Sequence, residues 1–382
     1  MSMSILSKIK KIARKGYSIV KPRIPFLDDD KKAELFLKKH PMKELSTEEK
    51  QEIDDYWGQF GIKFPHYKWF EMYYGVTGIH DPRFIPDMIA GHILFPHYNE
   101  KQFIAAWADK NLFERYIPTI QFPTTLCHKF NGSLYDDKWN YFSKEDIPSL
   151  ANNIIKRLNS DNSFVLKLTR NSAAGKGVKI YNIKTSDDIC EILNNNPSPN
   201  YIIQKKIRQH SFFQQFNKSS VNILRVVSWK HEGKVDILSV SIRYGIEGSY
   251  TDVAYVNGEE IVNVVGVNKP NGQVNHHYAN LDGIIPNVQF HLQDEFVPCF
   301  NEVIALTKKA HLQLQPFNII GWDFTINEDC VPICIEYNVV WPGTILYQYA
   351  NGPFAGDLTD DLLSFLKENN NQNLIIPKQF KL

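Results

Sequence analysis

Three things are scarce in this sequence: an excess of charge, a long apolar run and cysteine. The 43 Lys and Arg residues face 42 Asp and Glu residues, which leaves a formal charge of +1. This balance argues against a protein that binds nucleic acid through bulk charge. No stretch approaches the roughly 20 uninterrupted apolar residues of a membrane-spanning helix, and the N-terminus shows no apolar signal core with a cleavage site. We therefore expect a cytoplasmic protein that binds no nucleic acid.

The 5 cysteines form no paired metal-ligand pattern. Cys330 and Cys334 could hold a metal only with a second pair, which the sequence lacks, and both lie in a strand pattern. We expect the cysteines to be reduced and mostly structural. They are Cys127, Cys190, Cys299, Cys330 and Cys334.

The chain has 382 residues, of which 43% are hydrophobic, so it is globular and long enough to bury a core. Residues 1–27 form a basic block that contains no acid. Two interpretations of this block stay open. In the first, it forms a short amphipathic helix that rests peripherally on the anionic inner face of a membrane. In the second, which we favour, it forms a solvated helix that packs on the main body.

Helical patterns come first in the chain and strand patterns follow. Residues 28–118 contain many aromatics, which we interpret as core. Beyond Pro118, short apolar runs bounded by turn residues predict a mainly antiparallel sheet, and the class is therefore α+β. The expected helices are 31–39, 47–60 after the cap Ser46, 100–115, 293–314 and 358–368, and the expected strands are 164–168, 178–181, 201–204, 221–229, 235–243 and 261–267.

Two carboxylates fall on one face of a predicted β-hairpin. If the chain reverses around Asp329 and Cys330, Asp323 lies directly across from Glu336, and Asn338 shares their face. Like charges opposite each other destabilise a sheet unless a cation neutralises them, and oxygen ligands of this kind suit Mg²⁺. The pattern predicts a metal site. The alternative is that one of the acids pairs with an Arg or Lys.

A strand that delivers Lys167 is followed by a loop of small residues and by Lys176. Around Gly175, backbone N–H groups can approach phosphate oxygens while the two lysines add charge. A Walker A loop is excluded because Arg170 stands where that motif needs Gly, and Gly177 where it needs Ser or Thr. The alternative is an ordinary hairpin with a solvated Lys176.

Polar residues also interrupt or end other apolar strands. Gln204, Lys205 and Ile207 lie where a strand runs into a polar connector, which can pair with a purine edge, although a plain strand end has the same pattern. Arg225 stands inside an apolar strand and needs a phosphate or an acid as its partner. Arg243 also lies in a predicted strand and needs such a partner, although the pattern around it indicates this less strongly.

This order of elements resembles the ATP-grasp superfamily. The spacing of Asp323, Glu336 and Asn338 resembles the metal-binding triplet of the D-alanine:D-alanine ligases. Within the superfamily, the sequence is most similar to the sugar-transfer-associated ATP-grasp group, which is found with polysaccharide biosynthesis. The resemblance runs from about Asp81 to Phe365, and the segments that carry it are 109–113 (DKNLF), 221–225 (VNILR) and 321–323 (GWD).

The resemblance implies an α+β ATP-grasp fold, in which two subdomains clasp ATP between antiparallel sheets, with a helical N-terminal region. The ranges it implies are the basic segment 1–27, the helical region 28–118, a lid subdomain 119–215 with the lysine loop and adenine hinge, and a C-terminal subdomain 216–382 with the metal-binding hairpin.

The resemblance also implies roles for single residues. Lys110 and Lys167 hold the α- and β-phosphates, and Lys176 with the backbone around Gly175 covers the β/γ end as a lid. Arg225 stabilises the transferring phosphoryl group or an acyl phosphate.

Two further groups of residues are implied to bind the adenine and the metal. Gln204 stands where the superfamily commonly has an acid. The adenine hinge is lined by Gln204, Lys205 and Ile207, and one or two Mg²⁺ ions, or Mn²⁺, are held by Asp323, Glu336 and Asn338.

We therefore expect an ATP-dependent, ADP-forming carboxylate–amine ligase that works through an acyl phosphate. Positioning and charge neutralisation dominate such chemistry, which agrees with the absence of a Ser-His-Asp or Cys-His arrangement. The setting of the family implies an amino acid as one partner and a sugar acid or amino sugar of a surface polysaccharide as the other. The alternatives are a small-molecule or sugar kinase and a non-catalytic nucleotide-binding scaffold of a glycan assembly complex.

Overall fold

The computed structural model describes residues 25–170, 172, 175–285, 292 and 295–368. The chain divides into two compact units, residues 1–97 with 357–382 and residues 98–356. The first 24 residues of the basic block lie outside the described part, so its two interpretations stay predictions, as do the four domain ranges. Among the described helices, none is long and apolar enough to cross a membrane.

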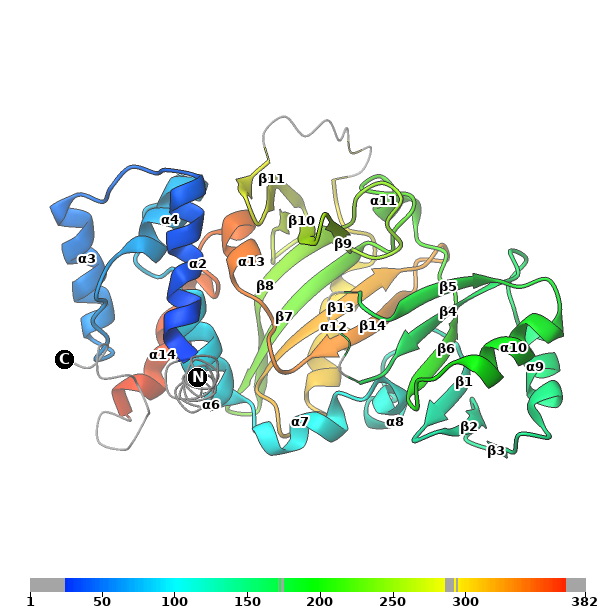
Figure 1. The fold of residues 1–382 in the computed structure, drawn as a ribbon. Helices are drawn as coiled ribbons and strands as arrows, with labels where there is room; N and C mark the ends of the chain where they lie inside the picture. Colours follow the sequence, from blue (N-terminus) through cyan, green and yellow to red (C-terminus); the bar gives the residue numbers. More distant parts are fainter. Residues whose placement is uncertain (1–24, 171, 173–174, 286–291, 293–294, 369–382) are drawn as a thin grey trace, which may run out of the picture. The chain divides into compact units, whose positions relative to one another are not determined.

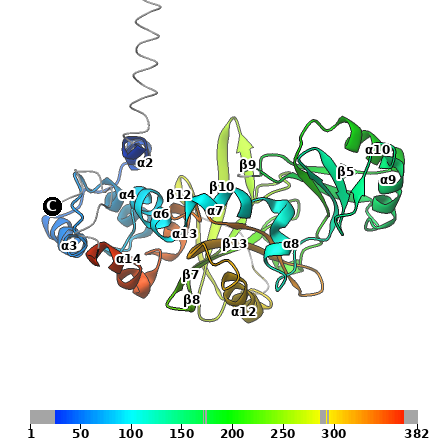
Figure 2. The same cartoon turned by 90° about the horizontal axis from the view of Figure 1, so that it is seen from below.

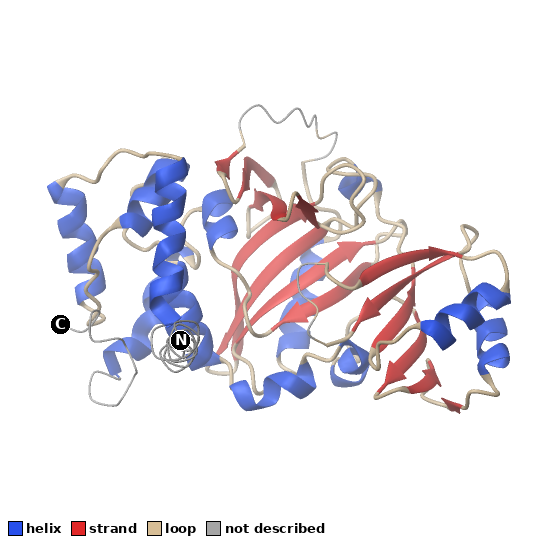
Figure 3. Ribbon diagram, viewed as in Figure 1, coloured by secondary structure: helices blue, strands red, loops and turns tan. Residues whose placement is uncertain are grey.

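The first unit consists of helices joined by loops, drawn in blue and tan in Figure 3. At the start of its second helix, Ser46 and Glu49 form a capping box, so the predicted cap is confirmed. The aromatic cluster is core as expected, with Trp57 and Phe70 fully buried. Its helices are α2 (Pro25–Lys39), α3 (Thr47–Gly58), α4 (Lys68–Thr77), α5 (Asp87–Ile89), the π-turn η2 (Ala90–Leu94), α6 (Phe95–Tyr98), the 3₁₀ turn η4 (Gly356–Leu358) and α14 (Thr359–Glu368).

The second unit contains two antiparallel sheets, and the smaller one has six strands. Two helices, α9 (Ile147–Lys156) and α10 (Ser186–Asn195), cover one face of it, as Figure 1 shows, over a core that includes Phe164 and Ile203. Because side chains alternate along a strand, Lys167 and Gln204 fall on the opposite face. The strand order is β3 (Tyr141–Phe142), β2 (Ser133–Asp136), β1 (Thr125–Phe130), β6 (Tyr201–Lys205), β4 (Ser163–Leu168) and β5 (Val178–Asn182).

The larger sheet has eight strands and is also antiparallel. Helix α12 (Phe300–His311) packs on β7 (Ile223–His231), β8 (Lys234–Tyr244) and β13 (Ile319–Ile326), and Figure 2 shows it beside these strands. Helix α13 (Ile345–Asn351) packs on β8, β10 (Glu259–Val267) and β11 (Val274–Asn280). The α+β class is thus confirmed. The order is β12 (Gly283–Ile284), β11 (Val274–Asn280), β10 (Glu259–Val267), β8 (Lys234–Tyr244), β7 (Ile223–His231), β13 (Ile319–Ile326) and β14 (Pro332–Asn338), and β9 (Val253–Val256) pairs with β10.

The expected strands and the hairpin that carries Asp323 and Glu336 are confirmed. Three helices differ from expectation, and the first of them, predicted over 31–39, already begins at Pro25. The helix predicted over 100–115 is broken into α7 (Lys101–Trp107), the 3₁₀ turn η3 (Lys110–Leu112) and α8 (Phe113–Tyr116), because Asp109 is extended and its side chain caps the turn. The helix predicted from residue 293 begins only at Phe300, since Cys299 has a left-handed φ of 51°; residues 293–294 lie outside the described part. A short helix, α11 (Ser211–Gln214), follows the connector after β6.

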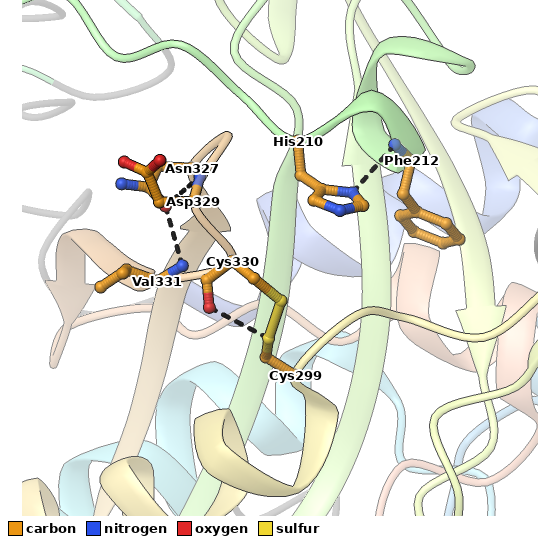
Figure 4. Close-up of a disulfide and its surroundings, with 7 residues drawn as sticks. All are labelled: His210, Phe212, Cys299, Asn327, Asp329, Cys330 and Val331. Carbon is orange, nitrogen blue, oxygen red and sulfur yellow. Dashed lines mark hydrogen bonds between the residues drawn. A yellow bond between two sulfur atoms is a disulfide. The ribbon is translucent and has the colours of Figure 1, made fainter.

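The expectation that the cysteines are reduced is wrong for one pair. Cys299 and Cys330 form a disulfide, with their Cα atoms 6.5 Å apart and a sequence separation of 31 residues. Cys330 lies in the hairpin turn rather than in a strand, because Asn327 accepts hydrogen bonds from the backbone of Asp329 and Val331 and closes that turn (Figure 4). Cys127, Cys190 and Cys334 are free thiols.

Candidate functional site

The β13–β14 hairpin places the predicted acids together. Asp323 pairs with Glu336 across the two strands, and Gly321 pairs with Asn338. The register shifts between Asp323 and Phe324, so Ile335 has no partner of its own in this ladder. Such a bulge re-aims the side chains next to it. The Asn338 amide donates to Asp323 Oδ2 at 3.0 Å, which joins the first and third residues of the triplet.

Arg225 neutralises Asp323 from the adjacent strand β7, where the two residues are register partners. Its Nε donates to Asp323 Oδ1 at 2.5 Å and its Nη2 to Oδ2 at 3.0 Å, while Nη1 donates to the Pro342 carbonyl at 2.6 Å. Both side chains are about 95% buried. Gly321 lets the strand pass close to this pair, because a Cβ would lie only 3.0 Å from Arg225 Nη1 and 3.2 Å from Pro342.

Lys110 neutralises Glu336. Its Nζ lies 3.1 Å from Glu336 Oε2 and also donates to Ser172 Oγ at 3.3 Å. Burial raises the pKa of Glu336, but the nearby cations Lys110, Lys167 and Arg225 outweigh burial and hold that pKa below its usual value. In this structure both acids therefore pair with a cation, which is the alternative to a metal site that the sequence left open.

Lys167 lies close to these charges without an ion pair to either acid of the hairpin among the described contacts. Burial lowers the pKa of Lys167 to about 8, with the positive charge of Lys110 adding to the decrease and Glu336 opposing it. A lysine whose ammonium form is destabilised by burial gains from an added anion, so a phosphate at this position would restore its full charge.

One small pocket brings three of the predicted residues together. Its enclosed volume is about 10 Å³, room for roughly one water molecule, and Lys110, Lys167 and Gln204 are part of its lining. These residues come from η3, β4 and β6, so only the tertiary fold joins them. The rest of its lining was not predicted from the sequence and consists of Phe113, Glu114, Phe122 and Ile335.

Glu114 is the unexpected charge in this lining. Burial raises the pKa of its carboxyl group, although a hydrogen bond from Thr125 Oγ1 at 2.8 Å partly offsets the increase. The only sequence feature that could have indicated Glu114 as a site residue is its position directly after the DKNLF segment. Phe113 and Phe122 belong to the apolar core of the larger sheet, so they could be predicted only as buried residues.

Gly175 and Lys176 belong to the lysine loop between β4 and β5, and both lie close to residues in or next to β9. Lys176 Nζ lies 5.0 Å from the centre of the Tyr255 ring, and a Cβ on Gly175 would lie 2.6 Å from Thr251 Oγ1. Gly175 also has a left-handed φ of 72°, which glycine adopts without strain. No described contact joins Lys176 to the acids of the hairpin, so its role as a lid stays a prediction.

The hinge residues lie at the end of β6. Gln204 is 6% exposed, and its Nε2 donates to the Pro123 carbonyl at 3.2 Å. The N–H of Lys205 donates to the Thr124 carbonyl, so it already belongs to the sheet. Ile207 is half-buried, two residues beyond the strand. The contact of these three residues with adenine stays a prediction.

Arg243 pairs with a buried acid, as an arginine in an apolar strand requires. Its Nη2 lies 2.6 Å from Asp252 Oδ2, and both side chains are largely buried. Burial disfavours its charge, but Asp252 and the neighbouring Tyr347 keep the pKa of Arg243 above its usual value. His276 and His277 are exposed.

The oxygen donors of the hairpin fit a hard divalent cation in their chemistry. Asp323 already accepts three hydrogen bonds, so about one of its four acceptor sites remains. Glu336 is 29% exposed and more open. Asn338 would have to present its amide oxygen rather than the nitrogen that now faces Asp323. Within the described ranges, no group of three or more His, Cys, Asp or Glu residues is arranged to hold a metal.

Several solved structures resemble the chain weakly. The ATP-grasp ligase PsnB, complexed with minimal precursor, has 12% identity and a TM-score of 0.39 over 70% of this chain and 63% of its own. VanG D-Ala:D-Ser ligase from Enterococcus faecalis has 10% identity and a TM-score of 0.38 over 68% and 60%. D-alanyl-alanine synthetase A from Vibrio cholerae has 13% identity and a TM-score of 0.36 over 68% and 62%.

The chain thus spans less than two thirds of the length of each of these structures. No curated protein matches it. The family model "Sugar-transfer associated ATP-grasp" matches residues 91–360, which is more than half of the sequence and falls inside the range that the motifs indicated. The chain belongs to the sugar-transfer associated ATP-grasp family.

Proposed function

We propose that the chain is an ATP-dependent carboxylate–amine ligase whose nucleotide binds at the pocket of Lys110, Lys167 and Gln204. The observation that carries this proposal is the 3.1 Å contact between Lys110 and Glu336. A cation suited to phosphate and an acid suited to a metal already touch, although they lie on η3 and β14. A polyphosphate with its divalent cation matches both charges at once.

The two lysines are assigned to the α- and β-phosphates. Lys110 exchanges Glu336 for phosphate oxygen, and Lys167 gains an anion that its buried ammonium group lacks. Gln204, Lys205 and Ile207 line the adenine, and the loop of Gly175 and Lys176 covers the β/γ end as a lid.

Asp323, Glu336 and Asn338 are assigned as the ligands of one or two Mg²⁺ ions, for which Mn²⁺ can substitute. When bound, such an ion neutralises phosphate charge and orients the γ-phosphate. Glu336 is the more exposed of the two acids and is released when Lys110 turns to the nucleotide. Arg225 has five N–H groups and uses three of them for Asp323 and Pro342, so two remain for a transferring phosphoryl group.

The proposed reaction has two steps. A substrate carboxylate oxygen forms a bond to the γ-phosphorus while the bond from that phosphorus to the β-bridging oxygen breaks, which yields an acyl phosphate and ADP. An amine nitrogen then forms the amide bond, and inorganic phosphate leaves as the amine loses its proton. The side chains of this site position and neutralise charge rather than form covalent bonds.

We assign an amino acid and a sugar acid or amino sugar as the substrates, in the cytoplasmic synthesis of a surface polysaccharide. The family to which the chain belongs supports the sugar partner. The segment from Arg243 to His277 is the region that we assign to the acceptor, with the Arg243–Asp252 pair at its base.

The test is nucleotide release from purified protein with ATP and Mg²⁺, across amino acids paired with uronic acids and amino sugars. We expect ADP together with a product of amide mass. ADP with a phosphorylated product would replace the ligase by a kinase. ATP binding without stimulated ADP release under any pairing would favour a nucleotide-binding scaffold.

A further inference from the structure

The turn that carries Lys110 is held by side chains that no assignment above uses. Asp109 is 1% exposed, and its Oδ1 accepts from the Asn111 N–H at 3.0 Å while Oδ2 pairs with Arg170 Nε at 2.5 Å. Asp109 and Asn111 therefore bracket Lys110 on both sides. Because these two flanking residues are buried and hydrogen-bonded, they restrict the backbone from which the Lys110 side chain projects.

Asn111 uses its whole amide group. Its Nδ2 donates to the Lys129 carbonyl at 3.1 Å and to Thr169 Oγ1 at 3.2 Å, and its Oδ1 lies 2.8 Å from His128 Nδ1. A carbonyl can only accept, so the amide nitrogen must face Lys129 and the amide oxygen must face the imidazole. It follows that His128 donates from Nδ1, which fixes its tautomer.

His128 is buried in β1 and has few other constraints. It is 2% exposed and stacks on Trp139, with ring centres 4.3 Å apart. Burial, aided by the charge of Arg115, lowers the pKa of His128 to about 4, so the ring is neutral near pH 7. Its Nε2 is buried and has no hydrogen-bond partner among the described residues. The bond to Asn111 is thus the only described hydrogen bond of this side chain.

The same network reaches the second lysine. Lys110 N donates to the Thr169 carbonyl at 3.3 Å, and Thr169 is also a partner of the Asn111 side chain. Thr169 follows β4, the strand that carries Lys167, by one residue. The turn of Lys110 and the strand of Lys167 are therefore joined at Thr169 by two hydrogen bonds, one from the Lys110 backbone and one from the Asn111 side chain.

We propose that His128 is a positioning residue that, through Asn111, holds Lys110 in register with Lys167 for binding the phosphates of the nucleotide. This inference rests on the proposed function, because it assumes that the two lysines bind phosphate. Loss of the imidazole leaves Asn111 Oδ1 buried without its donor, and the amide then reorients away from Lys129 and Thr169. The effect falls on phosphate binding and spares adenine.

The experiment measures the affinity for ATP and for adenosine by calorimetric titration, with melting temperature alongside. His128→Leu removes the donor, and His128→Asn retains an N–H donor close to the position of Nδ1. The matched control is His311→Leu, which removes another buried neutral imidazole, bonded to Ser228 Oγ and the Phe317 carbonyl. We expect H128L to weaken ATP binding by about tenfold, on the scale of outer partners that orient ligand-binding groups.

Four results together support the proposal. ATP affinity falls in H128L, H128N recovers most of it, adenosine affinity stays unchanged in both, and H311L lowers the melting temperature without changing ATP affinity. Unchanged ATP affinity in folded H128L, an equal loss for ATP and adenosine, or an H128N variant no better than H128L would overturn it. If H128L does not fold, Thr169→Val, which removes one acceptor of Asn111 at constant shape, carries the test, and unchanged ATP affinity in T169V would reject the network.

The proposed function and this inference fail in different ways. A wild-type protein that binds ATP but forms no amide contradicts the ligase, while the titrations still decide the role of His128. A wild-type protein that binds no ATP contradicts both.

Discussion

At the scale of single residues, charge compensation dominates the site. Asp323 pairs with Arg225 and Glu336 pairs with Lys110, so each acid of the hairpin has a cation. A buried charge without a partner costs free energy, so neither member of these pairs can be removed without a replacement charge. Under the proposed function, a nucleotide and its metal would bind together, because each would replace one side of the Lys110–Glu336 pair.

The first prediction concerns Glu336→Gln. We expect ADP release to fall by about 100-fold, or about 2.7 kcal/mol of activation free energy, because a metal ligand and the charge on it are lost. ATP-dependent ADP release and thermal melting are the measurements. Glu328→Gln, at the exposed turn of the same hairpin, is the matched control and should keep full activity. Normal turnover in E336Q would remove Glu336 from the metal site.

The second prediction follows from Lys167, whose pKa burial lowers to about 8. The protonated fraction falls from about 0.9 at pH 7 to about 0.1 at pH 9, and only the ammonium form attracts phosphate. ATP affinity should therefore decrease as the pH rises through 8, and binding at pH 8.5 should take up a proton. Titration calorimetry in two buffers of different ionisation enthalpy measures that uptake. Lys167→Arg should abolish it, and equal proton uptake in K167R would contradict this assignment.

At the scale of elements, the β13–β14 hairpin is held in place by contacts at its turn as well as by the pairing of its strands. Cys330 is bonded to Cys299 beside α12, and the Glu328 N–H and Ile326 carbonyl pair with the backbone of Arg208 and His210. The turn of the acid-bearing hairpin is thus joined by backbone hydrogen bonds to the connector that follows β6. Loosening the turn should affect both elements.

The third prediction is that reduction of the disulfide lowers stability. Closing a loop of this length contributes about 3–4 kcal/mol in the chain-entropy account. Melting followed by circular dichroism, with and without a thiol reductant, should show a lower midpoint on reduction, and Cys299→Ser should reproduce it. Cys190→Ser, at a free and half-buried cysteine, should melt like the wild type. Identical midpoints with and without reductant would show that the disulfide does not form in solution.

At the scale of the whole molecule, every residue assigned to the reaction lies in the second unit, residues 98–356. Both sheets of that unit contribute, the smaller one through Lys167 and Gln204 and the larger one through Arg225 and the hairpin. A ligand that contacts both sheets should stabilise the unit as a whole.

The fourth prediction is that ATP and Mg²⁺ stabilise the protein together and not singly. At 100 times the dissociation constant, a ligand that binds only the folded state adds about 2.7 kcal/mol. The melting temperature should rise with ATP and Mg²⁺ and return close to its initial value with a chelator. Asp323→Asn should lose most of the Mg²⁺-dependent part. A full shift by ATP in the presence of chelator would argue against the hairpin as a metal site.

Local patterns predicted much of the fold. Short apolar runs bounded by turn residues predicted β4, β6, β7 and β8, and the spacing of the hairpin predicted the Asp323–Glu336 pair, because the length of an apolar run and the register of a hairpin are local properties of the chain. The capping box at Ser46 was equally local. The motifs also indicated the family, since short segments with fixed order carry that information.

What the tertiary structure decided is which residues meet across distant segments. The sequence alone showed two acids and several cations, but not that Arg225 would neutralise Asp323 or that Lys110 would neutralise Glu336. The Cys299–Cys330 bond, the lining by Glu114 and the bond from His128 to Asn111 likewise join separate elements. Local periodicity sets which face of an element a side chain occupies. Only the packing of one element on another determines the partner that it finds there, and with it the charge that each group carries.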